Sequence, residues 1–149
     1  MDSELDKLEE AIVADMKSTY TETVIDHAMN PRNVGSIPDA DAYTSLLGPC
    51  GDNMEIWLKI RNGKVVNVSF WTDGCGTTIA AGSMATELAK GKTVQEALAI
   101  SAEVIARNLG GLPEDSVHCA GLASSTLKKA MIEYLNTQRE PWKRAYRKC

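Results

Sequence analysis

The sequence contains no apolar run of about 18 residues, the length that a membrane-spanning helix requires. It also lacks the basic start and apolar centre of a secretory signal, because residues 1–30 are dominated by acidic side chains and contain only Lys7 and Lys17 as basic ones. We therefore expect a cytoplasmic protein with no membrane partner.

Positive charge is scarce as well, since 16 Lys and Arg residues face 20 Asp and Glu residues and the net charge is -4. A nucleic-acid binder needs a basic face, so we expect no nucleic-acid partner. The exception is a basic C-terminal tail, residues 139–149, with Arg139, Lys143, Arg144, Arg147 and Lys148. The tail is a candidate docking segment, although a solvated terminus is the simpler interpretation.

Cysteine is sparse, with Cys50, Cys75, Cys119 and Cys149 scattered along the chain. This number and spacing exclude a small secreted disulfide scaffold. In a reducing compartment, dispersed cysteines are buried thiols, nucleophiles or metal ligands. No C-x-x-C pair, which structural zinc sites commonly use, occurs in the sequence.

The remaining composition suits one globular domain, because the 149 residues are 44% hydrophobic and 24% charged. Helical spacing of apolar residues over 3–29 predicts one long helix or two, ending before Pro31. Residues 34–49 resemble a loop. Alternating apolar residues in 54–61 and 64–71, with Val66, Val68 and Phe70 on one face, flank Asn62-Gly63 and predict a hairpin.

Helical patterns follow the hairpin. They cover residues 77–90, a short segment after the capping box of Thr93 and Glu96, residues 102–109, and residues 120–139. The predicted fold class is α+β, with a small antiparallel sheet, the hairpin plus an edge strand, packed against helices. We divide the chain into an acidic helical extension (1–19), a central domain (20–138) and the basic tail (139–149).

The cysteines lie at the ends of predicted elements. Cys50 precedes the first hairpin strand, Cys75 lies between the second strand and a helix, and Cys119 opens the last helix. Because hairpin strands are antiparallel, Cys50 and Cys75 emerge at the same end of the sheet. Cys50 also precedes Asn62 by as many residues as Cys75 follows Gly63, which indicates a symmetric register.

A helix N-terminus favours a thiolate, so we expect a lowered pKa for the thiols of Cys75 and Cys119. Asp52 lies two residues after Cys50, and His118 directly precedes Cys119. Gly51 after Cys50, and Gly74 and Gly76 around Cys75, allow a bulky inorganic group to approach the sulfurs. Three thiolates, one carboxylate and one imidazole are more ligands than one tetrahedral ion needs. From the residues alone, three interpretations stay open: a metal or cluster site, a Cys119 nucleophile with His118 as its base, or structural thiols.

Four motifs carry a resemblance to a known family: "VIDHAMNPRNVGS" at 24–36, "PCGD" at 49–52, "GCG" at 74–76 and "HC" at 118–119. Over residues 20–138 the chain resembles the iron-sulfur cluster assembly scaffolds of the IscU and NifU N-terminal family. The resemblance implies a scaffold rather than an enzyme. Such a scaffold assembles a [2Fe-2S] cluster from iron and desulfurase-derived sulfur and transfers it to apo-proteins. The alternative is a stable zinc or iron carrier without sulfur transfer.

The resemblance also implies roles for individual residues. Cys50, Cys75 and Cys119 would hold the cluster, with Asp52 or His118 as the fourth ligand, and Cys119 would accept the sulfur. Zinc can substitute for iron in such a site. The implied partners are a cysteine desulfurase, an electron donor such as a ferredoxin, and apo-protein acceptors. Either a monomer or a homodimer is compatible with the sequence.

The chain departs from the family pattern in one segment. Many relatives carry Leu-Pro-Pro-Val-Lys before the His-Cys pair, where a dedicated chaperone docks, whereas residues 112–116 here read Leu-Pro-Glu-Asp-Ser. Chaperone docking by that motif is therefore in doubt. Cys149 belongs to no motif and is interpreted as a free thiol or as the junction to a further NifU-type domain. His27 is interpreted as a packing residue.

Overall fold

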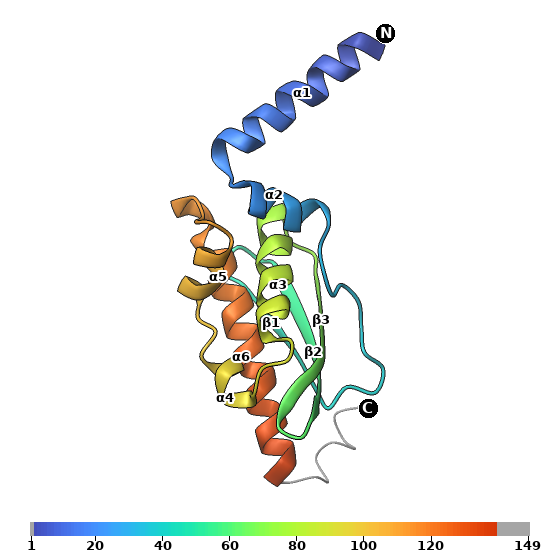
Figure 1. Ribbon diagram of the computed structural model, residues 1–149, viewed down its shortest axis with the longest axis vertical. Coiled ribbons are helices and arrows are strands. Elements are labelled where there is room, and N and C mark those ends of the chain that lie inside the picture. The colour runs from blue at the N-terminus through green and yellow to red at the C-terminus, as the bar shows by residue number, and fades with distance from the viewer. Residues whose placement is uncertain (1, 140–149) are drawn as a thin grey trace.

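The computed structural model describes residues 2–139, which form a three-stranded sheet covered by helices (Figure 1). The elements are α1 (Asp2–Thr19), α2 (Glu22–Met29), β1 (Ala42–Leu47), β2 (Asn53–Arg61), β3 (Lys64–Thr72), α3 (Gly76–Ala89), α4 (Val94–Leu98), α5 (Ala102–Asn108), the 3-10 turn η1 (Glu114–Ser116) and α6 (Val117–Arg139). Predictions about the basic tail and Cys149 lie outside the described residues.

The sheet confirms the predicted α+β class and hairpin. Strands β2 and β3 pair antiparallel, and Asn62 and Gly63 have φ angles of 54° and 74°. Positive φ at both positions is the mark of the two-residue turn whose twist matches that of the strands. Asn and Gly adopt this conformation most readily, so the turn follows directly from the sequence.

The hairpin register differs from the symmetric one that we predicted. A bulge between Lys59 and Ile60 shifts the pairing by one residue. Val65 is therefore fully buried next to the turn, whereas Val66, predicted on the same face as Val68 and Phe70, is 48% exposed. The bulge changes which β3 residue faces the core near the turn, but it leaves both strand ends at the same edge of the sheet.

The edge strand lies within the segment that we expected to be a loop. Strand β1 pairs antiparallel with β2, which makes the sheet order β1-β2-β3. Ala42 and Thr44 face the interior, while the residues between and after them are more exposed. The loop prediction for residues 34–49 is thus wrong at 42–47, because so short a strand with few buried side chains has a weak alternating pattern.

The N-terminal pattern resolves into two helices. Thr21 caps α2 by accepting a hydrogen bond from the Val24 backbone N–H. Helix α1 extends away from the rest of the protein (Figure 1), and its Leu5 and Leu8 are exposed. The division of the chain at residue 19 into a helical extension and a central domain remains a prediction. Within residues 2–139, no helix has the length and apolar character needed to cross a membrane.

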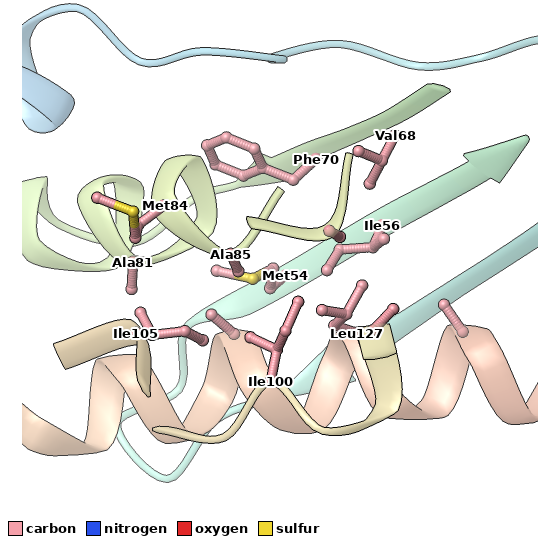
Figure 2. Close-up of a cluster of buried hydrophobic side chains, with 14 of the residues drawn as sticks. Met54, Ile56, Val68, Phe70, Ala81, Met84, Ala85, Ile100, Ile105 and Leu127 are labelled. Carbon is pink, nitrogen blue, oxygen red and sulfur yellow. The ribbon is translucent and has the colours of Figure 1, made fainter. Parts of the chain in front are cut away.

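The core lies between the sheet and helices α3 and α6 (Figure 2). Met54 and Ile56 from β2 meet Phe70 from β3, and Ala85 and Leu127 cover them from the two helices. The small residues of α3 allow this helix to approach the sheet closely. The close approach fixes the position of the α3 N-terminus, where Cys75 lies.

We expect Gly82→Ala in α3 to lower the free energy of unfolding by about 1–3 kcal/mol, the usual cost of overpacking. A Cβ at Gly82 would lie 2.6 Å from the Phe70 ring. Gly121→Ala in α6 is the matched control, because nothing lies within 4 Å of its added Cβ. Urea unfolding checks both variants, and equal stability of the two would contradict the packing described here.

Candidate functional site

The candidate site lies at one end of the sheet, where three free cysteines come from separate segments. Cys50 lies in the turn before β2, Cys75 is the N-cap residue of α3, and Cys119 lies in the first turn of α6. Helix α6 begins at Val117, three residues before the predicted start. His118 and Cys119 therefore belong to the helix rather than to the loop before it.

Hydrogen bonds fasten the two loops that carry Cys50 and Cys75. The Asn53 backbone N–H donates to Asp73 Oδ1 at 2.8 Å. The Thr72 hydroxyl donates to the Asn53 carbonyl oxygen at 2.6 Å. The segments before β2 and after β3 are thereby held side by side, so that this edge of the sheet is a fixed platform.

The His118 imidazole bridges two of the cysteines. Its Nε2 lies 3.1 Å from the Cys50 sulfur and 3.6 Å from the Cys119 sulfur. Cys50 is 68 positions away in sequence. A ring nitrogen between two sulfurs can act as a hydrogen-bonding partner of either thiol or as a metal ligand.

Sequence reasoning missed Thr78, which connects the other half of the site. Its hydroxyl donates to Asp52 Oδ2 at 2.9 Å, and it lies 3.4 Å from the Cys119 sulfur and 3.7 Å from the Cys75 sulfur. Its spacing of three residues from Cys75 is compatible with this contact, because the third residue after an N-cap points back toward the cap. Through Thr78 and His118, all five predicted site residues form one continuous group of contacts.

The thiols differ in their environments. Partial burial opposes ionisation of Cys75, but the backbone N–H groups of Thr78 and Thr77 at the start of α3 and the Thr78 hydroxyl favour the thiolate and outweigh the burial, so the pKa of the Cys75 thiol is lowered. Burial raises the pKa of the Cys119 thiol, and the Thr78 hydrogen bond only partly offsets this. The prediction of a lowered pKa is thus confirmed for Cys75 and wrong for Cys119, which is only 2% exposed.

We expect metal-free protein to show two distinct alkylation profiles with iodoacetamide. The thiolate is the reactive form, so the lowered pKa makes Cys75 react at lower pH than an ordinary thiol. The raised pKa and burial make Cys119 react only at higher pH. Mass spectrometry of the labelled peptides across a pH series measures both rates. Faster labelling of Cys119 than of Cys75 at neutral pH would contradict these environments.

Gly74 lies directly against the centre of the site. A Cβ at this position would lie 2.7 Å from Thr78 Cβ and 2.8 Å from Asp52 Oδ2. Glycine beside Cys75 removes a side chain next to the sulfur and so leaves access for a bulky inorganic group. At Gly74 the structure adds a second reason, because only glycine leaves room for the pair of Thr78 and Asp52.

The three thiols do not surround a common point in this structure. Within the described part of the chain, no three Cys, His, Asp or Glu side chains are grouped so that they could hold one metal ion. The contacts instead run through the Thr78 hydroxyl and the His118 ring. Metal binding by these side chains therefore requires that they exchange hydrogen bonds with one another for bonds to the metal.

Apolar surfaces flank the site on two sides. Cys75 and the start of α3 line one pocket together with Tyr20, Val24, Ile25 and Ala28. A second groove beside His118 is lined by Leu46, Leu47, Pro49 and Leu122. A macromolecule that reaches these thiols meets an apolar surface.

His27 lies outside the site, as predicted. It is buried, and its Nδ1 lies 2.7 Å from the Ser83 hydroxyl oxygen in α3. The same oxygen accepts a hydrogen bond from the Arg32 backbone N–H. His27 therefore helps to pack α2 and the following loop against α3.

Comparisons with known proteins identify the family of the chain. The family model described as the NifU-like N terminal domain matches residues 19–141. The iron-sulfur cluster assembly scaffold protein IscU 1 of Archaeoglobus fulgidus is 47% identical over 116 residues, covering 77% of this chain and 76% of that protein. The scaffold protein IscU of Aquifex aeolicus is 43% identical over 126 residues, covering 83% of this chain and 80% of its own.

The fold is shared with solved structures. One of them, described as a candidate iron-sulfur cluster assembly scaffold protein for the SUF system of Fervidobacterium islandicum, superimposes with a TM-score of 0.62 at 26% identity. The match covers 75% of this chain and 96% of that one. From the family match and the identity to these relatives, the chain belongs to the NifU-like N-terminal domain family.

Proposed function

We propose that this protein is a scaffold on which an iron-sulfur cluster is assembled and from which it is transferred to apo-proteins. The observation that carries the proposal is the convergence of three thiols, one carboxylate and one imidazole from separate segments at one end of the sheet. Relatives with scaffold names support the role of scaffold rather than enzyme. They do not favour the alternative of a stable zinc or iron carrier.

We propose that the cargo is a [2Fe-2S] cluster held by Cys50, Cys75 and Cys119, with Asp52 or His118 as the fourth ligand. Thiolates are the usual ligands of such clusters. An oxygen or nitrogen ligand in place of the fourth thiolate makes the cluster easier to release, as a scaffold requires. Zinc, which prefers the same sulfur and nitrogen ligands, would occupy the site in place of iron.

Cys119 is the proposed sulfur acceptor. Its thiolate would attack the outer sulfur of a persulfide on a cysteine desulfurase, so that the donor's sulfur–sulfur bond breaks and the donor cysteine leaves as a thiolate. Two electrons from a donor such as a ferredoxin would then release the sulfur as sulfide and regenerate the Cys119 thiolate. Because Cys119 is buried, the persulfide would be shielded from solvent after it forms.

The scaffold role implies a sulfur donor and cluster acceptors as partners. The apolar surfaces beside Cys75 and His118 suit the docking of such proteins. Docking of a dedicated chaperone on residues 112–116 stays in doubt, since Pro113 is followed by Glu114 and Asp115, both of which are exposed. We also propose a cytoplasmic location, with either a monomer or a homodimer as the resting form.

The direct test is anaerobic reconstitution with a cysteine desulfurase, cysteine, ferrous iron and a reductant. We expect visible absorption of a cluster on the protein, followed by transfer of the cluster to an apo-ferredoxin. Zinc or iron binding without sulfide would instead identify a carrier. Failure to assemble any cluster on intact protein would refute the scaffold proposal.

We expect Asp52→Ala to slow cluster transfer at least about tenfold, a change of about 1.4 kcal/mol in the barrier to release. The reason is that the labilising oxygen ligand is lost while the thiolates remain. Asp115→Ala, which removes an exposed carboxylate on η1, is the control. Transfer to apo-ferredoxin measures both. An unchanged rate in Asp52→Ala would assign the fourth ligand to His118.

A further inference from the structure

Thr78 lies at the centre of the site, although it is not among the residues that the family motifs identify. It lies in the first turn of α3 and is 0% exposed. Its hydroxyl oxygen is within 3.7 Å of the Asp52 carboxylate, the Cys75 sulfur and the Cys119 sulfur.

The chemistry of the hydroxyl makes its hydrogen bonds mutually exclusive. A threonine hydroxyl has a single proton to donate. That proton is directed either to Asp52 Oδ2 at 2.9 Å or to the Cys119 sulfur at 3.4 Å, the shorter contact being to the carboxylate. While the Thr78 hydroxyl donates to the Asp52 carboxylate, it cannot donate to the Cys119 sulfur. The position of the Asp52 carboxylate therefore determines whether the Cys119 sulfur receives this hydrogen bond.

The surroundings hold the hydroxyl in place. The Thr78 methyl carbon Cγ2 packs against Gly74, where an added Cβ would lie 2.8 Å away. Threonine is branched at Cβ, so its χ1 angle has only two common values in a helix. Packing of the methyl group against Gly74 therefore favours the conformation in which the hydroxyl faces the site.

Building on the proposed scaffold function, we infer that Thr78 is a positioning residue that controls the binding and release of the cargo. In the metal-free site, its hydroxyl holds the Asp52 carboxylate beside the thiols and competes with a metal for that carboxylate. When the Asp52 carboxylate binds the metal, its hydrogen bond from Thr78 breaks and the Thr78 hydroxyl donates to the Cys119 sulfur. Hydrogen bonds to ligand sulfurs tune cluster properties. When the cargo leaves, the hydroxyl again binds Asp52.

The inference is tested first on metal-free protein, with zinc as the probe and a chromophoric chelator as the competitor. Thr78→Val keeps the side-chain shape but leaves Asp52 without its hydroxyl donor, so zinc should bind about fivefold more tightly, as expected for one hydrogen bond of about 1 kcal/mol. Thr78→Ser, which keeps the hydroxyl, should bind zinc as the unaltered protein does. Thr78→Ala is a second hydroxyl-free variant, in case Thr78→Val does not fold.

The matched control is Thr126→Val in α6. Thr126 is also 0% exposed, but its hydroxyl donates to the Leu122 carbonyl oxygen, away from the site. A purely structural effect of losing a buried hydroxyl would appear in this control as well. In an Asp52→Ala background, Thr78→Val should no longer tighten zinc binding, because the carboxylate for which the hydroxyl and the metal compete is gone and only the hydrogen bond to the Cys119 sulfur is lost.

Several outcomes would overturn the inference: unchanged zinc affinity in both hydroxyl-free variants, an equal change in Thr126→Val, or tighter zinc binding by Thr78→Val that persists without Asp52. On cluster-loaded protein, Thr78→Val should slow transfer to apo-ferredoxin by the same factor of about five. If the unaltered protein assembles no cluster, the scaffold proposal fails, while the zinc measurements still decide the role of Thr78.

Discussion

Cys119→Ser protein should assemble no detectable cluster under conditions in which the unaltered protein does. The substitution removes a proposed ligand and the proposed sulfur acceptor together, and serine oxygen does not form a persulfide. The site would also lose the sulfur that contacts both Thr78 and His118. Visible absorption and the sulfide content after anaerobic reconstitution measure the effect.

Cys149→Ser is the matched control for Cys119→Ser. Cys149 follows the residues that the family model matches and belongs to none of the four motifs. We expect this variant to assemble as much cluster as the unaltered protein. A normal cluster on Cys119→Ser would remove Cys119 from the proposed site.

Gly74→Ala should reduce zinc and cluster binding by at least about tenfold and destabilise the protein by about 1–3 kcal/mol. The added methyl group would overlap Thr78 and the Asp52 carboxylate, with separations of 2.7 and 2.8 Å. These two groups must move, which displaces the Asp52 carboxylate and the adjacent Cys75 from the positions in which we propose that they bind the metal. Chelator competition and urea unfolding measure the two effects separately.

Gly76→Ala provides the comparison for Gly74→Ala, since it also alters a glycine adjacent to Cys75. A Cβ at Gly76 would lie 3.6 Å from Ala28 Cβ, an ordinary contact. We expect its metal affinity and stability to remain close to those of the unaltered protein. Similar losses in both variants would mean that chain flexibility, rather than space around Thr78 and Asp52, determines the need for glycine.

The sequence predicted the elements whose signals are local. Asn62-Gly63 specifies the turn through positive φ angles, and Thr93 with Glu96 forms the predicted capping box. The position of Cys75 at a helix N-terminus follows from the change of apolar period after β3. These features depend on residues that are close together in the chain.

Features that depend on tertiary packing were not predicted. The bulge at Lys59 and Ile60 changes the inner face of β3, and the location of β1 depends on its pairing with β2. Burial raises the pKa of the Cys119 thiol despite its place in the first turn of a helix. Thr78 was missed because its spacing from Cys75 alone does not distinguish it from a buried packing residue.

The central claim is that sulfur passes through this protein on its way to an acceptor. The most direct measurement follows sulfur-labelled cysteine in the presence of a cysteine desulfurase, ferrous iron, a reductant and apo-ferredoxin, with a chelator that captures free iron. We expect labelled sulfide first on this protein and then in the ferredoxin cluster, with none transferred by Cys119→Ser protein. Labelled sulfide that reaches ferredoxin at the same rate without this protein, or in the presence of Cys119→Ser protein, would show that sulfur does not pass through Cys119 of this protein.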